Sequence, residues 1–378
     1  MKRIIIIILV VFNQNLFGQI DTTKQKNLEI IGDFRFRVEQ DWNSKNQNGV
    51  KRNDRSRLRY RFRFGLNYSI DKQSSFGGRL RSGNINDQQG PHVTLGGNQG
   101  EFELVSIGLE KLFYQYENKT FTGWIGKNSI PLTKLNEVFW NDNVFPEGLG
   151  IKYHSKLKNQ KFLNDLSIHA GHFIIKSQNK NFSDDSYLQI LQLTTNIKER
   201  IKIFPGLYYF KSIGNYPDDK QTFEMNYSIF HLGSQIIVDK KQKFKLGIEY
   251  YNNFQNYSHT DSIPDNLKNE TEGFVISATY GSMKNKGDWL FYLSYANIQK
   301  YSIVDYFAQN DWSRWDYSSI GASGSRISNF QGVEIKIGYA VKKNFNLNLR
   351  TYFVEQLVKI GDFKENGSRM RLDLNIGF

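Results

Sequence analysis

One stretch of the sequence decides the fold: Arg57-Leu58-Arg59-Tyr60-Arg61-Phe62-Arg63-Phe64-Gly65-Leu66-Asn67-Tyr68-Ser69-Ile70. Every even-numbered residue in it is apolar or aromatic, and every odd-numbered residue is polar or glycine. Because successive side chains of a β-strand point to opposite faces, the stretch predicts a strand with one apolar and one polar face. Its fourteen residues exceed an ordinary globular strand and match a tilted strand that crosses a lipid bilayer.

The same alternation recurs along the whole chain, and we count sixteen segments that carry it. They lie at about residues 29–39, 57–70, 75–83, 102–116, 120–127, 147–154, 162–174, 186–196, 200–210, 222–238, 243–254, 272–281, 288–298, 329–340, 344–354 and 368–378. Single-chain bacterial barrels have an even number of strands. The pattern therefore predicts an all-β protein, a transmembrane antiparallel β-barrel of about sixteen strands.

The connections between these segments alternate between short and long. The short ones include 71–74 and 341–343, and the long ones are 40–56, 84–101, 128–146, 175–185, 211–221, 255–271, 299–328 and 355–367. Outer-membrane barrels have short periplasmic turns and longer extracellular loops. We therefore expect both the N- and C-termini on the periplasmic side. Lysines in the short turns are suited to contact with anionic lipid headgroups, and acids in the long loops are suited to sharing divalent cations with the outer leaflet and its lipopolysaccharide. The alternative is that these turns and loops are simply polar.

The first residues have the pattern of a secretory signal peptide. Met1, Lys2 and Arg3 precede an apolar run from Ile4 to Phe12, which is too short to span a bilayer as a helix. We expect a signal peptide at 1–18 that is cleaved after Gly18, a short polar lead at 19–28 and a single barrel domain at 29–378. This export places the protein in the outer membrane. The alternative is that the apolar run is a buried first strand.

Composition excludes several classes of function. The chain has no cysteine, so thiol catalysis, disulfides and a lipoprotein anchor are excluded. The formal net charge is +13, but the arginines sit inside strands of an exported chain, so we assign them to a barrel wall and not to a nucleic-acid surface. We expect no cofactor and no metal site.

An enzymatic barrel is the alternative class, and the sequence gives it little support. His169 and His172 are three residues apart, so on a strand they face opposite sides and cannot act as a pair. The chain has neither a Gly-x-Ser-x-Gly nor a His-Glu-x-x-His motif. We therefore predict that the protein is not an enzyme and that it has no catalytic residues.

Three sets of motifs resemble a known family. They are Gly32-Asp33-Phe34-Arg35-Phe36-Arg37 followed by Arg55-Ser56-Arg57-Leu58-Arg59-Tyr60-Arg61, then Gly123-Trp124-Ile125-Gly126-Lys127-Asn128 with Trp140-Asn141-Asp142 and Pro146-Glu147-Gly148-Leu149-Gly150, and last Arg369-Met370-Arg371-Leu372-Asp373-Leu374-Asn375-Ile376-Gly377-Phe378. Together they resemble the putative porin family of Bacteroidota and, more distantly, alginate-export barrels and phosphate-selective porins.

The resemblance implies an outer-membrane channel. The terminal Phe378, preceded by apolar residues at alternate positions, resembles the signal that the barrel assembly machinery reads. The alternative functions are an exporter of an anionic polysaccharide and, with less support, an outer-membrane enzyme. The oligomeric state stays open, and a homotrimer is one option.

The inward-facing arginines suggest how such a channel would select solutes, since sixteen strands leave an aqueous lumen. Closure of the last strand on the first brings them to one wall. We expect a pore-lining basic ladder of Arg35, Arg37, Arg57, Arg59, Arg61, Arg63, Arg79, Arg81, Arg350, Arg369 and Arg371. The sequence thus predicts a passive diffusion channel for small hydrophilic solutes with a preference for anions.

The long connection 128–146 is a candidate constriction loop. It contains Ile130-Pro131-Leu132 and Trp140, and apolar side chains in a long loop suggest that it packs on the inner wall of the barrel. The acids Glu137, Asp142 and Glu147 would then face the arginines. The alternative is an ordinary surface loop with scattered acids.

Overall fold

The computed structural model describes residues 27–97, 102, 104–157, 163–178, 181–214, 223–241, 243–313 and 328–378. The proposed signal peptide and most of the polar lead lie outside these residues. The first half of the chain forms β1 (Leu28–Lys45), β2 (Arg55–Ser69), β3 (Ser74–Ser82), β4 (Val93–Thr94), β5 (Ile107–Glu117), β6 (Phe121–Lys127), β7 (Glu147–Lys156), β8 (Leu163–Lys176) and β9 (Ser186–Ile197).

The second half forms β10 (Ile201–Gly214), β11 (Glu224–Asp239), β12 (Phe244–Asn253), β13 (Glu272–Gly281), β14 (Trp289–Ile298), β15 (Phe330–Lys342), β16 (Phe345–Gln356) and β17 (Asn366–Gly377). The helical elements of the described residues are short: η1 (Phe182–Asp184), η2 (Asp265–Leu267), η3 (Asp305–Phe307) and α2 (Asn310–Ser313). No helix within these residues is long and apolar enough to cross a membrane.

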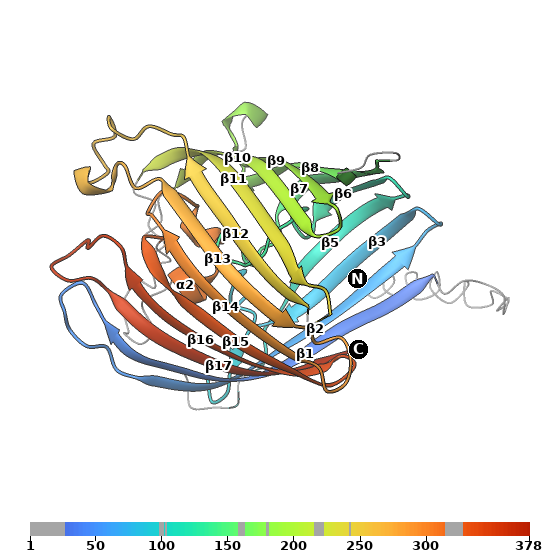
Figure 1. Ribbon diagram of the computed structural model, residues 1–378, viewed down its shortest axis with the longest axis horizontal. Helices are drawn as coiled ribbons and strands as arrows, with labels where there is room; N and C mark the ends of the chain where they lie inside the picture. Colours follow the sequence, from blue (N-terminus) through green and yellow to red (C-terminus); the bar gives the residue numbers. More distant parts are fainter. Residues whose placement is uncertain are drawn as a thin grey trace, which may run out of the picture.

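The strands form one closed antiparallel barrel (Figure 1). Apart from the two-residue β4, each strand pairs with its neighbours in sequence, and β17 pairs with β1 to close the sheet. All sixteen segments expected from the alternating pattern are strands, which confirms the predicted fold class. β1 is longer than expected and continues to Lys45, whereas β5 begins only at Ile107. The extra β4 pairs with the part of β2 that β3 does not reach.

Closure involves the last residue of the chain. The Phe378 N–H donates to the Gly32 carbonyl at 3.0 Å, and the Gly32 N–H donates to the Phe378 carbonyl at 2.9 Å. A Cβ on Gly32 would lie 2.3 Å from Cζ of the Phe378 ring. The same Cβ would lie 2.9 Å from the Arg63 carbonyl oxygen, so a side chain at position 32 would displace the Phe378 ring and crowd the backbone of β2.

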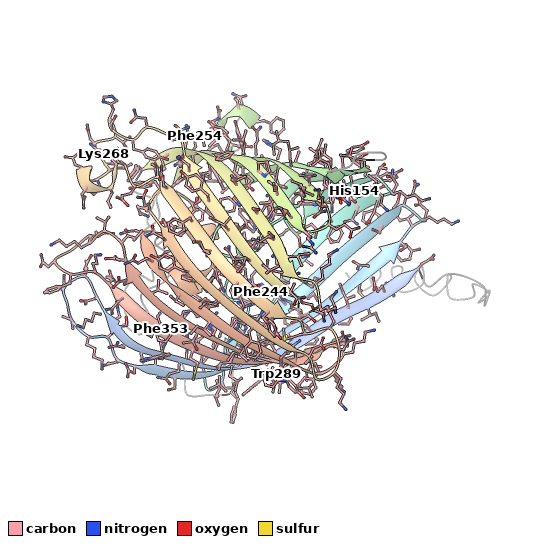
Figure 2. All side chains as sticks on the ribbon, viewed as in Figure 1. His154, Phe244, Phe254, Lys268, Trp289 and Phe353 are labelled. Carbon is pink, nitrogen blue, oxygen red and sulfur yellow. The ribbon has the colours of Figure 1, made fainter. Side chains whose placement is uncertain are left out.

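The outer face of the barrel is apolar, as the period of two requires. Leu58, Phe62 and Leu66 of β2 are exposed, whereas Arg61 and Arg63 of the same strand are buried. Figure 2 shows side chains on both faces of the wall and labels Trp289 and Phe353, which are 51% and 46% exposed. An apolar exterior with a polar interior is the arrangement of a barrel in lipid.

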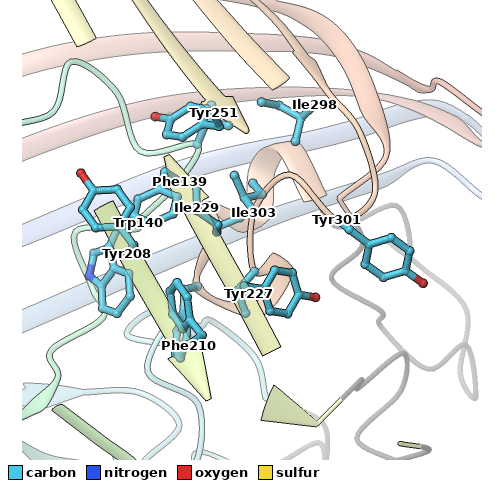
Figure 3. Close-up of a cluster of buried hydrophobic side chains, with 14 of the residues drawn as sticks. Phe139, Trp140, Tyr208, Phe210, Tyr227, Ile229, Tyr251, Ile298, Tyr301 and Ile303 are labelled. Carbon is cyan, nitrogen blue, oxygen red and sulfur yellow. The ribbon is translucent and has the colours of Figure 1, made fainter. Parts of the chain in front are cut away.

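The interior of the barrel contains a buried apolar core, separate from the apolar outer face. Loop 128–146 and residues 299–313 contribute Phe139, Trp140 and Ile303, which lie against Tyr208 of β10 and Tyr251 of β12 in one buried cluster (Figure 3). This core contains residues of β6 and of β8–β16, and Phe330, Tyr352 and Val354 are its members on β15 and β16. The open part of the lumen is lined by other residues of β15 and β16 and by β17, β1 and β2.

Candidate functional site

The candidate site is a cavity of about 870 Å³ inside the barrel, which we call the lumen cavity. One side is formed by β15, β16, β17, β1 and β2, and the other by loop residues including Gln89, Glu137, Asn141 and Asp311. Its lining is strongly charged. Eleven side chains are cationic, ten of them arginines, and six are carboxylates. The lumen cavity therefore has an excess of positive charge.

Strand register places the charged residues in rows across the wall. Three rows run through β16, β17, β1 and β2, and each is a set of directly paired residues. The rows are Tyr352–Arg369–Asp41–Arg55, Arg350–Arg371–Glu39–Arg57 and Asn348–Asp373–Arg37–Arg59. In the first two rows a carboxylate has an arginine on both sides, and in the third row Asp373 lies between Asn348 and Arg37. Opposite charges directly across a ladder stabilise a sheet, so the wall tolerates this density of arginine.

The wall carboxylates make close ion pairs that were not predicted from the sequence. Asp373 receives two hydrogen bonds from Arg37, at 2.6 Å from Nε and 2.8 Å from Nη2. Asp41 accepts Nε of Arg369 at 2.5 Å. Forked pairs of this kind are strong and fix the guanidinium plane. Asp33, Glu39, Asp41 and Asp373 occupy the same alternate positions as the predicted arginines, so the period of two could have identified them.

The next row, towards the short-turn end of the barrel, contains no carboxylate. It is Asn346–Asn375–Arg35–Arg61, in which two arginines are direct neighbours. Nε of Arg35 donates to Asn375 Oδ1 at 2.6 Å. Like charges directly across a ladder are unfavourable. The carboxylates that pair with Arg35 and Arg61 lie outside this row: Asp373 lies 3.6 Å from Arg35, and Asp33 contacts Arg61.

Nine of the eleven arginines expected in the basic ladder line the lumen cavity, and Arg79 and Arg81 do not. Nε of Arg79 donates to Glu110 of β5 at 2.7 Å. Arg81 donates to the carbonyls of Ser82, Asn84 and Asp87. These two arginines hold the start of loop 84–101 and the β3–β5 contact, because their partners lie on those elements. The arginine ladder is thus shorter than expected.

Four arginines of the wall keep an unused donor. The Nε–H groups of Arg57, Arg59, Arg61 and Arg63 are buried and have no hydrogen-bond partner among the described residues. A buried donor without an acceptor is costly, so these groups are unsatisfied polar atoms of the wall. We call β2 the donor strand for this reason.

His92 adds no charge to the lumen cavity. Desolvation inside the barrel, with the fields of Arg37 and Arg35, holds the pKa of its imidazole well below the ordinary value. Its carbonyl accepts a hydrogen bond from Nη2 of Arg59 at 3.2 Å. His92 is therefore a neutral group at physiological pH, and the charge of the cavity is that of its arginines, lysine and carboxylates.

Loop 128–146 runs inside the barrel and is bound to the inner wall by side chains of three strands. His169 of β8 contacts the Pro131 carbonyl at 2.7 Å. Gln192 of β9 accepts the Thr133 N–H at 2.7 Å and donates to the Thr133 carbonyl at 2.9 Å. Glu249 of β12 accepts the Leu135 N–H at 3.2 Å. Side chains thus replace the backbone partners that a strand would supply.

The aromatic residues of the loop pack beyond these anchors. Phe139 is 5% exposed and stacks on Tyr208, with ring centroids 4.8 Å apart, and on Tyr251, at 5.4 Å. Trp140 stacks on Phe307 of η3 at 4.7 Å. This second contact joins loop 128–146 to residues 299–313. Both segments therefore narrow the lumen together.

The three acids expected to face the arginines have different positions. Glu137 lies 3.6 Å from Arg350, measured from Oε1 to Nη1. Asp142 lines the cavity, but its close partner is Lys134 at 2.6 Å. Glu147 does not face the arginines: it begins β7, its side chain is 64% exposed, and it pairs with Lys127 directly across the ladder. The proline at 146 ends the loop, so Glu147 already follows the strand alternation.

One loop carboxylate that was not predicted as a site residue lies within the arginine wall. Asp311 of α2 accepts a hydrogen bond from Nη1 of Arg369 at 2.9 Å and another from Nη1 of Arg371. Its position in the long connection 299–328 gave no sign of this role. The apolar residues around it, such as Phe307 and Trp312, were the available signal that the segment is buried.

Closed barrels of sixteen strands with a polar, loop-narrowed lumen are channel-forming proteins of outer membranes. The sequence over residues 47–256 matches the family described as "Putative porin", and the chain belongs to this family. No curated protein matches the sequence.

Solved porin structures have the same fold at low sequence identity. OprB of Pseudomonas putida has a TM-score of 0.55 and 13% identity, over 93% of this chain and 94% of that one. OmpF of Salmonella typhi, in a complex with daunomycin, has a TM-score of 0.53 and 11% identity, over 93% and 97%. OmpT of Vibrio cholerae, in its trimer form, has a TM-score of 0.50 and 9% identity, over 92% and 98%. Family and fold identify an outer-membrane channel and point away from an enzyme.

Proposed function

We propose that the protein is an outer-membrane porin through which small hydrophilic solutes diffuse passively, with a preference for anions. The observation that carries this proposal is the excess of cationic side chains, eleven against six carboxylates, in the lining of the lumen cavity. A narrow passage with low-dielectric walls focuses the field of its charges, so the local concentration of anions rises and that of cations falls.

The cations of the wall are suited to weak, repeated contact with anions. Guanidinium groups remain charged at any physiological pH and match carboxylate and phosphate geometry. The arginines of the donor strand lie at successive inward positions of β2, from Arg57 to Arg63, and all four line the lumen cavity. An anion could therefore exchange one donor for the next along the wall, and conduction needs several weak sites of this kind.

The internal apolar core supports small solutes over export of an anionic polysaccharide. Loop 128–146 and residues 299–313 contribute packed aromatic rings to this core inside the barrel. A polymer would need a continuous wide path past these segments. We therefore keep polysaccharide export only as the alternative that binding and conductance measurements discriminate: an exporter would bind its polymer and conduct ions poorly.

We further propose the setting in which this channel works. Residues 1–18 would be removed as a signal peptide, both termini would face the periplasm, and the assembly machinery would read Phe378. The outer surface would contact outer-membrane lipid and lipopolysaccharide. A homotrimer is the assembly we propose, since the similar OmpT barrel is described in a trimer form.

Planar-bilayer recordings test the channel and its selectivity together. The wild-type protein should form open channels that favour chloride over potassium. The double variant Arg59→Gln with Arg61→Gln should lose most of this preference, because it removes two charges that line the cavity. A matched control is Lys240→Gln with Lys241→Gln, in the short turn after β11. Cation preference in the wild type that the double variant leaves unchanged would refute the proposal.

A further inference from the structure

Asp311 is a buried carboxylate inside the arginine wall, although it does not belong to a strand. Its side chain is 0% exposed. Oδ1 lies 2.9 Å from Nη1 of Arg369, and Oδ2 contacts Nη1 of Arg371. Within the described residues, it is the only loop carboxylate in ion-pair contact with two arginines of the wall. The lumen thus contains a counter-anion that the chain itself supplies.

Residues around Asp311 hold this carboxylate in place. Trp312 is 1% exposed and packs on Phe330 and on Tyr352, with ring centroids 5.8 and 5.7 Å apart. Nε2 of Gln309 donates to Asp311 Oδ2 at 3.0 Å. The Asn310 N–H donates to Oε1 of Gln89 at 3.1 Å, which ties α2 to loop 84–101. The position of Asp311 is therefore fixed by packing as well as by charge.

The two arginines do not depend on Asp311 for neutralisation. Arg369 also donates to Asp41 at 2.5 Å, and Arg371 also donates to Glu39 at 3.0 Å. Both of these acids lie on β1 and belong to the barrel wall. Removal of the Asp311 charge would therefore leave neither guanidinium as an orphan, and the structural cost would be smaller than for a wall acid.

We propose that Asp311 is a residue that determines selectivity: its carboxylate occupies the donors of Arg369 and Arg371 and limits the anion preference of the channel. This inference rests on the proposed function and goes further, because it assigns the degree of preference to one residue of a loop. The Asp311 carboxylate between Arg369 and Arg371 reduces the positive potential of the lumen cavity. It also occupies two hydrogen-bond donors that a solute carboxylate or phosphate would otherwise use.

The test compares Asp311→Asn with the wild-type channel in planar bilayers. For an ion about 8 Å away, near one Debye length, loss of one unit charge should raise the chloride-to-potassium permeability ratio about twofold. Asp311→Glu should keep the wild-type ratio. Asp265→Asn is the matched control, since that carboxylate is 94% exposed on η2, outside the lumen cavity.

A second variant tests the same claim in the opposite direction. Asn310 lines the lumen cavity beside Asp311, and Asn310→Asp adds a carboxylate there. Its permeability ratio should fall about twofold for the same Coulombic reason. Asn310→Asp makes the claim testable even where Asp311→Asn does not yield folded channels.

An unchanged ratio in either variant would overturn the inference, even with a higher conductance, because Asp311 would then only anchor the loop. A failure of the proposed function can be told apart from a failure of this inference. The proposed function is tested by whether the wild-type channel prefers anions, whereas the inference is tested by the change in the permeability ratio between the variants and the wild type.

Discussion

Because the Phe139 ring is stacked on two tyrosines of the barrel, we predict that this one side chain holds loop 128–146 against the inner wall. The perturbation is Phe139→Ala, which removes a ring that is 5% exposed and stacked between Tyr208 and Tyr251. The hydrogen bonds of the loop upstream, from Thr133 to Gln192, would remain. We therefore expect the variant to fold as a barrel with a loosened constriction.

The magnitude follows from burial and from the two stacked contacts. Burial of a phenylalanine side chain contributes about 2–3 kcal/mol. Each aromatic pair adds about 0.5–1.5 kcal/mol. The loss is then about 3–6 kcal/mol, which overlaps the usual cost of about 3–5 kcal/mol for Phe→Ala in a packed core. A loop that loses this much docking free energy should leave the wall for a measurable part of the time.

Single-channel recording is the assay, with Phe182→Ala as the matched control because Phe182 is 92% exposed. Phe139→Ala should show larger or fluctuating conductance, whereas the control should conduct as the wild type does. Equal and steady conductance in all three proteins would refute the idea that this loop narrows the channel.

Three further predictions test the seam, the wall and the internal carboxylate. Gly32→Ala should lower the yield of folded barrel in refolding assays, since the new Cβ would lie 2.3 Å from the Phe378 ring. Gly78→Ala is the control and should fold normally, because the atom nearest to its Cβ is 3.7 Å away. Equal yields of the two variants would contradict this account of closure. Asp373→Asn should lower the free energy of unfolding by about 3 kcal/mol in urea titrations, because it leaves the buried Arg37 without its forked partner; unchanged stability would contradict the pairing. Burial opposes ionisation of Asp311, but Arg371, Arg369 and Arg37 hold the pKa of its carboxyl below the ordinary value. Because the pKa of Asp311 is lower in the folded state, its carboxylate stabilises the packed position of residues 299–313 at pH values above the unfolded pKa of about 3.9. This stabilisation is lost as the pH falls through the lower folded-state pKa. The wild-type permeability ratio should therefore not change from about pH 7 to about pH 5 on account of Asp311; a change that Asp311→Asn abolishes would contradict it.

The fold could be predicted from the sequence because each strand carries its own signal. The inward Arg61 and outward Phe62 of β2 illustrate it: lipid on one side and water on the other enforce strict alternation over the whole strand. The signal weakens where a strand leaves the membrane. β1 continues past Glu39 to Lys45 because its pairing with β17 and β2 persists there. The alternating pattern of the sequence gave no reason to extend the strand beyond Glu39.

The site was only partly predictable, because alternation assigns a face and not a partner. It placed Arg35 and Arg37 inside but could not show that Arg37 pairs with Asp373, which needs the register of the closing seam. Loop positions carry no such period. Asp311 enters the wall because surrounding apolar residues bury its segment, and no local pattern distinguishes it from Glu147, which points to Lys127.

The zero-current potential of the wild-type channel across a potassium chloride gradient, measured first at low and then at high salt, tests the central claim most directly. We predict anion selectivity that is strong at low salt and declines as the Debye length falls from about 10 Å at 0.1 M to about 3 Å at 1 M. Cation selectivity, or a preference that salt does not alter, would contradict an arginine-lined lumen as its origin.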